Sequence, residues 1–278
     1  MDYISGEKFV GLSDYIYNKG RYYENYYKYP HTFNIKKINK SRHTPIIYTT
    51  LYLIKPLFDE LRDCGRDVLL ITHNGDLCVD EDLFLQKPDC IREWYAQNVD
   101  YVDDSLHPIP IGLENSRWFK KDKKILKLQE IVKTEKKIKN LVYLNLNLSV
   151  KHNANIRQPI YVMLRDRHYV TTEYGKNGID FNNYLNNLYN HCFMVCPEGN
   201  GIDVHQPWES MYINTIPVQK KNKNNRNWRE LPVCWLDDWS QLGDESFLLS
   251  EYTRITNTDH DTSKLYFSYW ANEIKMSL

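Results

Sequence analysis

Short apolar runs of strand length alternate along this chain with segments whose apolar residues have helical spacing. The alternation is clearest over residues 46–72, where the apolar runs 46–50 and 67–72 flank a segment, 51–63, with apolar residues every three or four positions. A continuous short apolar run is typical of a strand buried on both faces, and the wider spacing is typical of a helix with one buried face. Strands that alternate with helices in this way predict parallel α/β units.

A second series of the same kind follows a Lys-rich stretch at 120–139. Further strands are expected at 90–98, 107–112, 141–146, 168–172, 192–196, 216–218 and 232–235, and further helices at 155–165, at 180–190, from Pro207 onward and at 262–276. The Lys-rich stretch is interpreted as a solvated linker helix with a narrow apolar stripe, because the chain as a whole is neutral. The first forty residues are Tyr-rich with weak periodicity, so we expect them to be irregular.

Two strand–helix series joined by a linker predict an α/β protein with two Rossmann-like lobes and a ligand cleft between them. The expected division is an N-terminal lobe over residues 1–125, a C-terminal lobe over 126–260, and a terminal helix over 261–278 that could pack back on the first lobe.

Charge and composition exclude several classes of partner. The 278 residues contain 36 Lys and Arg against 36 Asp and Glu, a net charge of +0, so the basic excess that nucleic-acid binding needs is missing. The longest apolar runs have strand length, and the N-terminus lacks the pattern of a signal peptide, so membrane insertion is not expected. Six cysteines at irregular spacing predict reduced thiols rather than a zinc site. These features predict a cytoplasmic protein.

The most informative segment is 193–218, which reads FMVCPEGNGIDVHQPWESMYINTIPV. A buried strand, a loop with Gly199 and Gly201, and a helix that begins near Pro207 are the components of a phosphate site, because free N–H groups at a helix N-terminus attract anions. A carboxylate such as Glu209, one turn into that helix, could accept hydrogen bonds from a ribose. The alternative is that the glycines only make a tight turn and that Glu209 faces solvent.

This segment resembles the exostosin-like glycosyltransferases, whose pattern is C-P-x-G-x-G-x-D-x-H-R-x-W-E followed by a short I-P-V strand. The matching residues are Cys196, Pro197, Gly199, Gly201, Asp203, His205, Trp208, Glu209, Ile216, Pro217 and Val218. Residues 68–76, 94–98 and 109–116 look like the N-terminal lobe of small members of this group encoded by large DNA viruses of algae, and 231–239 looks like their late C-terminal lobe. The resemblance covers most of the chain from about residue 45 and implies the two-lobed GT-B fold.

The resemblance implies a glycosyltransferase that uses a nucleotide sugar, with the donor in the C-terminal lobe and the acceptor in the N-terminal lobe. Glu209 would bind the ribose of the donor, Gly199 and Gly201 its diphosphate, and His205 would lie beside the diphosphate or the transferred sugar. The remaining donor-binding candidates on this loop are Glu198, Asn200 and Asp203.

One position departs from the family pattern: Gln206 stands where the family usually has Arg, which removes a cation from the leaving diphosphate. Arg157 is the candidate replacement, because a leaving diphosphate needs positive charge or N–H donors in a site without metal. The alternative for Arg157 is a salt-bridging arginine on the surface.

Two features of the sequence refine the expected mechanism. Retaining GT-B enzymes often carry two glutamates eight residues apart on this loop, and here neither Glu198 nor Glu209 has such a partner, which favours inversion. The D-x-D spellings at Asp80/Asp82 and Asp259/Asp261 are interpreted as solvated loops, so no metal and no cofactor is expected. A metal-dependent transferase that uses Asp80 and Asp82 remains an alternative.

Inverting displacement needs a base for the proton of the acceptor hydroxyl, and a carboxylate or imidazole serves best. The turn after the strand at 67–72 supplies Asp76 as the first candidate and His73 as the second, with Asn74 to orient the acceptor. The chain is 14% aromatic, and Trp94, Tyr95 and Trp118 could stack on acceptor sugars.

The expected function is therefore transfer of a sugar from a UDP-sugar to a hydroxyl of a glycan or glycoprotein, in glycan biosynthesis. By analogy with the small viral relatives, a pentose such as xylose is the expected sugar, and the cytoplasm would be that of a host cell. The alternative from another class is an inactive protein that binds a nucleotide sugar or a glycan, which the substitution at Gln206 favours. The oligomeric state is left open.

Overall fold

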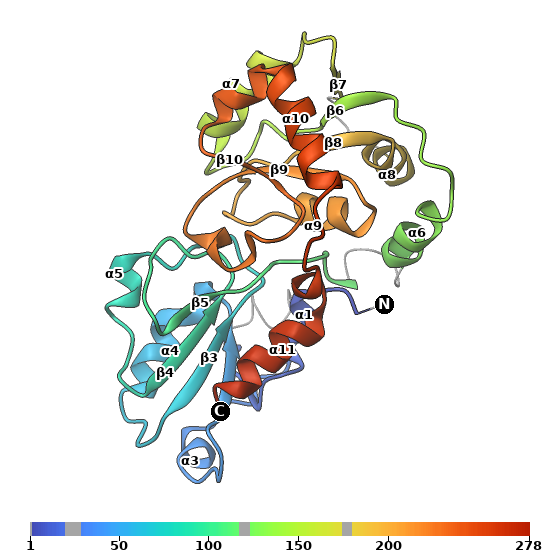
Figure 1. The fold of residues 1–278 in the computed structure, drawn as a ribbon. Coiled ribbons are helices and arrows are strands. Elements are labelled where there is room, and N and C mark those ends of the chain that lie inside the picture. Colours follow the sequence, from blue (N-terminus) through green and yellow to red (C-terminus); the bar gives the residue numbers. More distant parts are fainter. Residues whose placement is uncertain (1, 20–28, 117–122, 174–179) are drawn as a thin grey trace.

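The computed structural model describes residues 2–19, 29–116, 123–173 and 180–278, and it consists of two lobes, each built on a five-stranded parallel sheet (Figure 1). The first sheet has the order β1-β2-β3-β4-β5, with β1 (Tyr15–Ile16), β2 (Ile46–Thr49), β3 (Val68–Thr72), β4 (Ile91–Ala96) and β5 (Leu106–Pro108). The second has the order β10-β9-β8-β6-β7, with β6 (Asn140–Leu144), β7 (Val170–Thr172), β8 (His191–Val195), β9 (Ile216–Lys220) and β10 (Cys234–Leu236). The predicted α/β class with two Rossmann-like sheets is confirmed.

Helices connect and cover these strands. They are α1 (Gly6–Val10), α3 (Ile35–Ile38), α4 (Ile54–Leu61), α5 (Glu81–Phe84), α6 (Lys123–Ile131), α7 (Ala154–Leu164), α8 (Phe181–Tyr189), α9 (His205–Tyr212), α10 (Glu245–Thr256) and α11 (Phe267–Met276). Short 3₁₀ turns are η1 (Leu51–Leu53), η3 (Asn224–Trp228), η4 (Trp239–Gly243) and η5 (Ser263–Leu265). In the described part of the chain, no helix has the length and apolar character needed to cross a membrane.

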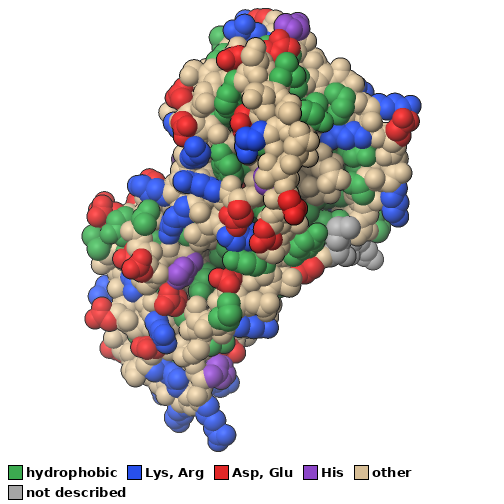
Figure 2. Space-filling view, in the orientation of Figure 1, with side chains coloured by type: hydrophobic (Ala, Val, Ile, Leu, Met, Phe, Trp, Pro, Cys, Tyr) green, Lys and Arg blue, Asp and Glu red, His purple; other side chains and the backbone are tan. Residues whose placement is uncertain are grey.

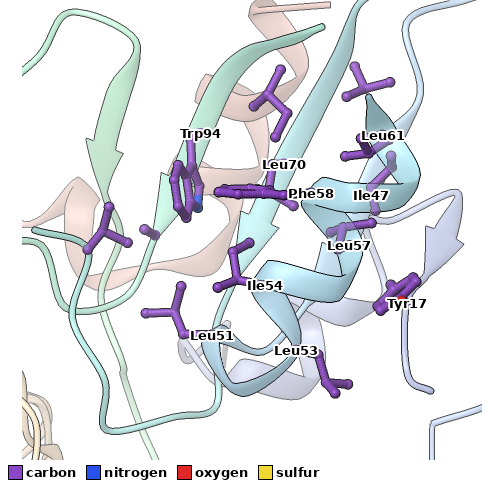
Figure 3. Close-up of a cluster of buried hydrophobic side chains, with 14 of the residues drawn as sticks. Tyr17, Ile47, Leu51, Leu53, Ile54, Leu57, Phe58, Leu61, Leu70 and Trp94 are labelled. Atoms are coloured by element: carbon purple, nitrogen blue, oxygen red, sulfur yellow. The ribbon is translucent and has the colours of Figure 1, made fainter. Parts of the chain in front are cut away.

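The strand order of the first sheet decides what covers its two faces. Parallel strands added in one direction with right-handed crossovers place all connecting helices on the same face. Accordingly, Leu57 and Phe58 of α4 pack with Leu70 and Trp94 on that face (Figure 3). The helices that connect these strands do not reach the opposite face of the sheet, which is covered by α1 and α11 instead.

The chain termini provide this second cover. Phe9 of α1 and Trp270 and Ile274 of α11 share one buried cluster with Leu69 and Ile71 of β3. Figure 1 shows α11, at the red end of the chain, running along the first lobe beside α1. Neighbouring residues of β3 point to opposite faces of the sheet. Because both faces are covered, the whole strand is buried, as its continuous apolar run predicts.

The second sheet is covered on both faces by its own helices. Leu164 of α7 and Leu248 of α10 pack with Val142 and Phe193 on one face. On the other face, Leu128 of α6 and Leu185 of α8 pack in a cluster that also contains Tyr143 and Met194. The strand order reverses direction between β6 and β8, so the loops after these two strands diverge from a topological switch point.

Several elements differ from the sequence-based expectations. Helix α10 was not predicted, and α1, α3 and β1 lie in the region expected to be irregular. The terminal helix starts at Phe267 rather than at 262, because Tyr266 is extended and forms a bridge with Tyr3. Helix α6 ends at Ile131, well before residue 139.

Candidate functional site

The carboxyl ends of the two sheets meet at the boundary between the lobes. Segments after β4 and β5 are hydrogen-bonded to the loop after β8 and to η3. The N–H of Val99 donates to Asn224 Oδ1 (2.8 Å) and the N–H of Ile111 donates to Asp203 Oδ2 (2.7 Å). Ligands of open α/β sheets bind outside the carboxyl ends of the strands, so this boundary is the candidate site.

Asn98 connects the two halves of this boundary. Its side chain is fully buried, its Nδ2 donates to the carbonyl of Gly75 (2.9 Å), and its Oδ1 accepts from the N–H of Asp203 (2.9 Å). A single carboxamide therefore joins the turn that carries Asp76 to the glycine loop after β8. Asn98 was not among the predicted site residues, because nothing local to its position in the sequence indicates a partner in the other lobe.

The two glycines of the loop are closely covered by side chains. A Cβ at Gly199 would lie 2.9 Å from Arg157 Nη2, and a Cβ at Gly201 would lie 2.7 Å from Asn98 Nδ2. A side chain at either position would have to displace one of these neighbours, which favours glycine there. Protein groups therefore occupy the space beside both glycines in this structure.

Arg157 does not fit either interpretation made from the sequence. It is buried, and its guanidinium donates to the carbonyls of Glu198 (2.7 Å), Pro197 (3.1 Å) and Asn147 (3.1 Å). Because its donors serve the backbone, Arg157 fixes the loop at the switch point between β6 and β8. The predictions of a cation facing the diphosphate and of a surface salt bridge are both corrected.

The other loop residues differ in exposure. Glu198 Oε1 accepts from Asn222 Nδ2 (3.3 Å), while its Oε2 is buried and has no hydrogen-bond partner in the described structure. Asn200 is exposed, and its Oδ1 accepts from the N–H of Lys151 (2.9 Å). Gln206 donates to the carbonyl of Asn145 (2.9 Å), which ties α9 to the loop after β6.

Asp203 joins the lobes. Its carboxylate accepts from the N–H groups of Ile111 (2.7 Å) and Val204 (3.0 Å) and from Trp208 Nε1 (3.1 Å). Burial raises the pKa of Asp203 to about 7, against the lowering effect of these hydrogen bonds. Since protein donors take up both oxygens, Asp203 positions the loop in this structure and does not face a ligand.

Glu209 lies in a buried cluster of charged and polar side chains. It is 4% exposed; its Oε1 forms an ion pair with Lys124 of α6, and its Oε2 accepts from the hydroxyl of Tyr184 of α8 (2.6 Å). The ammonium group of Lys124 also lies 3.8 Å from Glu114 Oε2. Glu209 therefore does not face solvent, which was the alternative left open by the sequence.

The electrostatics of this cluster keep Glu209 ionised. Burial alone would raise the pKa of Glu209, but the charge of Lys124 and the hydrogen bonds from Lys124 and Tyr184 outweigh it, and the net effect lowers that pKa. Lys124 and Tyr184 were not among the predicted site residues. The Lys-rich stretch was interpreted as solvated, yet Lys124 is among its buried members.

His205, the first residue of α9, lies beside this cluster. Its Nδ1 donates to the carbonyl of Gly112 (2.7 Å), a contact between the lobes. Burial lowers the pKa of His205, so the ring is neutral near pH 7 and its Nε2 carries a lone pair. The charges of Lys124, Glu209 and Glu114 all act on this imidazole.

A cavity of about 250 Å³ adjoins the cluster. Lys124 and Glu114 form part of its wall, together with Tyr3, Glu7 and Ser116. The cluster is therefore next to open space at the lobe boundary, although Glu209 itself is covered.

On the N-terminal side, His73 cannot act as the base in this structure. It is buried, its Nε2 bonds to the carbonyl of Pro110 (3.1 Å), and its Nδ1 accepts from the N–H of Asn74 (2.8 Å). Burial lowers the pKa of His73 to about 4. Both ring nitrogens are engaged, so the second candidate for the base is corrected to a residue that shapes the turn.

The other two residues of this turn keep polar groups near the boundary. Asn74 has a left-handed backbone (φ 61°), donates to the hydroxyl of Tyr48 (2.7 Å) and accepts from Asn115 Nδ2 (2.8 Å). Asp76 is exposed and follows Gly75, the residue held by Asn98.

The aromatic acceptor candidates are covered. Trp94 is fully buried between Phe58 and Phe84, with its Nε1 bonded to Thr72 Oγ1 (2.9 Å), so it cannot stack on a ligand (Figure 3). Tyr95 is 5% exposed, and its hydroxyl is bonded to Ser277 Oγ (2.6 Å). The prediction of an acceptor platform at Trp94 is corrected, and Trp118 lies outside the described residues.

The acidic pairs considered for metal binding have other contacts. Asp80 caps α5 by accepting from the N–H of Leu83 (2.9 Å), and Asp82 is exposed on the same helix. Asp261 accepts from the N–H of Ser263 (2.9 Å). Among the described residues, no group of three or more His, Cys, Asp or Glu side chains could hold a metal ion.

Comparison of the chain with protein-family models and with curated proteins found no match. The fold and the site together define a two-lobed α/β protein with a buried charged cluster where the carboxyl ends of its sheets meet. Charges of both signs are interspersed over the face shown in Figure 2, in keeping with the balanced composition.

Proposed function

We propose that this protein is an inverting, metal-independent glycosyltransferase of GT-B architecture that transfers a sugar from a UDP-sugar to a hydroxyl of a glycan or glycoprotein acceptor. The observation that carries this proposal is the position of the 193–218 segment. Its loop starts at the switch point of the second sheet and meets the carboxyl ends of the first, and its helix holds the ionised Glu209 at this boundary.

The donor side of the proposal rests on Glu209 and Lys124. Each carboxylate oxygen can accept more than one hydrogen bond, so a ribose hydroxyl can share Glu209 with Tyr184 or replace it. Lys124 supplies a cation beside α9. Gln206 is uncharged and the guanidinium of Arg157 donates to backbone carbonyls, so neither residue provides this charge. The proposed role of the Lys124 ammonium group is to stabilise the leaving diphosphate.

The acceptor side rests on the turn after β3. The acceptor oxygen attacks the anomeric carbon while the bond from that carbon to the diphosphate oxygen breaks, and the proton passes to a base. Asp76 is the proposed base, because it is exposed and its turn is joined to the glycine loop through Asn98. In this proposal the neutral His205, which bonds to the carbonyl of Gly112 at the same boundary, contacts the transferred sugar or the diphosphate. A pentose such as xylose remains the proposed sugar.

A second candidate function is a protein that binds a nucleotide sugar or a glycan without turnover. It is favoured by one observation: both oxygens of Glu209 are engaged by protein groups, and the side chain is 4% exposed. A donor that reaches Glu209 must share these oxygens with Lys124 and Tyr184 or displace one of them.

Donor binding and hydrolysis test both candidates. The protein is incubated with UDP-xylose, UDP-glucose, UDP-galactose and UDP-N-acetylglucosamine in excess chelator, and both thermal stability and released UDP are measured. A transferase shows a higher Tm with one donor and slow UDP release, since a ligand that binds only the folded state stabilises it. A rise in Tm without release supports the binding protein. Absence of any shift contradicts the transferase and the protein that binds a nucleotide sugar.

A further inference from the structure

A second cavity lies outside the glycine loop and the Glu209 cluster. Its volume is about 480 Å³, and its lining residues come mainly from β4, β5, η3, η5 and α11. Tyr95, His107, Arg226, Asn227, Tyr269 and Glu273 are among its lining residues. This volume is within the range of pockets that hold small molecules. Both lobes and the C-terminal helix contribute to it, so it exists only in the assembled fold.

Aromatic rings form one wall of this cavity. The rings of Tyr95 and His107 stack with their centroids 4.7 Å apart, and the side chain of His107 is 31% exposed. Tyr269 of α11 adds a third, half-buried ring, and the ammonium group of Lys264 lies over it, 5.5 Å from the ring centroid. Flat rings with polar edges suit the C–H faces of sugar rings, which are apolar while their rims carry hydroxyl groups.

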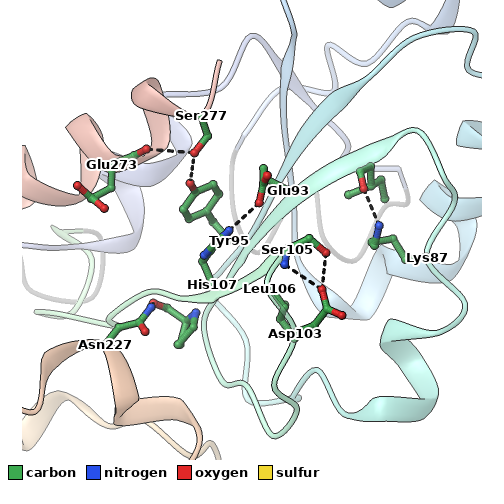
Figure 4. Close-up of polar contacts among 12 residues, drawn as sticks. Lys87, Glu93, Tyr95, Asp103, Ser105, Leu106, His107, Asn227, Glu273 and Ser277 are labelled. Atoms are coloured by element: carbon green, nitrogen blue, oxygen red, sulfur yellow. Dashed lines mark hydrogen bonds and ion pairs between the residues drawn. The ribbon is translucent and has the colours of Figure 1, made fainter.

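Hydrogen-bonding groups surround these rings. Figure 4 shows Glu273 and Ser277 on the helix side and Asn227 on the opposite side, with Tyr95 and His107 between them. His107 Nε2 is bonded to Glu93 Oε2 (2.7 Å), which fixes the ring and leaves Nδ1 as its other polar atom. Carboxylate, amide and imidazole groups in one cavity offer both donors and acceptors to a ligand rich in hydroxyl groups.

The charge of the lining favours a neutral ligand over a phosphate. Arg226 donates to the carbonyls of Tyr101 (3.3 Å), Lys223 (2.8 Å) and Leu106 (2.5 Å). Lys264 forms an ion pair with Glu230. Both cations therefore already serve protein acceptors, and Glu273 adds a negative charge that would repel an anion.

We propose that this cavity is a binding site for a neutral oligosaccharide, separate from the donor site at Glu209. One sugar ring packs on His107 and Tyr269, and its hydroxyl groups bond to Glu273 and Asn227. The proposal uses neither Glu209 nor Asp76, so it holds or fails independently of the transferase activity.

Calorimetric titration and saturation-transfer NMR test this site with the full chain and no nucleotide sugar. The probes are xylohexaose, cellohexaose, maltohexaose and mannohexaose, with inorganic phosphate as the charged alternative. We expect at least one hexasaccharide to bind and phosphate not to compete with it. Absence of binding by all four hexasaccharides, or binding of phosphate in this cavity instead, overturns the proposal.

Matched variants locate the binding. Tyr269→Ala should weaken the bound hexasaccharide by about fivefold to tenfold, the loss expected for one aromatic packing contact. Glu273→Gln should also weaken it, because this substitution removes the charge while the side chain keeps its size. Tyr266→Ala, three residues from Tyr269 and outside the lining, should leave the affinity unchanged. Equal affinity in Tyr269→Ala, Glu273→Gln and the control would place the sugar elsewhere and overturn the proposal.

Discussion

The carboxamide of Asn98 lies directly against the backbone of Gly201, so that a Cβ built on the glycine would be 2.7 Å from Asn98 Nδ2. The same carboxamide bonds to the carbonyl of Gly75 in one lobe and to the N–H of Asp203 in the other. This contact between the two lobes therefore depends on the absence of a side chain at Gly201.

Gly201→Ala should destabilise the protein by about 1–3 kcal/mol, because the added methyl group has to displace the buried Asn98. Denaturant unfolding measures this change. Gly65→Ala is the matched control, since a Cβ there has no atom within 4 Å, and its effect should be small. Equal stability of the two variants would show that the lobes can separate at this point without cost.

Glu209→Gln should destabilise the fold by about 3–5 kcal/mol, because it leaves the buried ammonium of Lys124 without its main partner. This differs from the small effect expected for a residue that only contacts a ligand. Lys124→Met should be costly for the same reason, while the double variant should lose much less than the sum of the two.

Denaturant unfolding of all four proteins in the cycle gives the coupling energy. Lys221→Met is the control, because its ion pair with Asp237 is exposed. Additive effects at positions 124 and 209 would contradict the buried ion pair. Independently of stability, loss of donor binding in Glu209→Gln under conditions where it remains folded would support the ribose role.

His73 should make stability depend on pH. Its pKa is about 4 in the folded protein against an ordinary value of 6.5, so it stabilises the fold above pH 6.5 and loses this contribution as the pH falls toward 4. The slope due to one such group is at most about 1.4 kcal/mol per pH unit. Asp203 acts in the opposite sense, because its raised pKa favours the folded state as the pH falls below about 7.

Comparison of unfolding free energies between pH 7.5 and 5 for wild type and His73→Gln isolates this contribution. The variant should lose less stability on acidification than the wild type does. His43→Gln, at an exposed histidine, should follow the wild type. Parallel curves for wild type and His73→Gln would show that His73 titrates normally.

Asp76→Asn should lower kcat by about 10²–10⁴-fold and leave donor affinity unchanged, since a base acts only on the acceptor proton. Initial rates with donor and acceptor, together with a donor Kd, separate these two quantities. Asp80→Asn is the matched control, because Asn also caps a helix and Asp80 is the first residue of the alternative D-x-D pair. Full activity of Asp76→Asn would move the base to another group, and His205 would be tested next.

Much of the fold could be predicted because its strands are buried on both faces. Strands Val68–Thr72 and His191–Val195 are buried at every position and consist mostly of apolar residues, and both are central strands of parallel sheets. Strand β1 has only two residues and depends on its pairing with β2, so no local pattern could predict it. Helix α10 did carry a local signal, since Asp244 caps it and Glu245 follows in the first turn, and this signal was missed.

The candidate site was predictable in part. The segment 193–218 showed that a glycine loop and a helix carrying Glu209 follow a buried strand, and the structure has this arrangement. The partners of these residues come from elsewhere: Lys124 from α6, Tyr184 from α8, and Asn98 from the other lobe. A sequence motif covers only its own segment, so it cannot indicate which distant side chains form hydrogen bonds or ion pairs with its carboxylates.

By itself, the amino-acid sequence determined the parallel α/β class and the presence of two sheets, because apolar periodicity acts through local backbone geometry and burial. Only the tertiary structure decided that Arg157 serves backbone carbonyls, that Trp94 belongs to the core, and that Lys124 is the cation beside Glu209. The physical reason is that burial and charge pairing depend on which surfaces meet, and here those surfaces belong to two lobes and to a C-terminal helix that returns to the first.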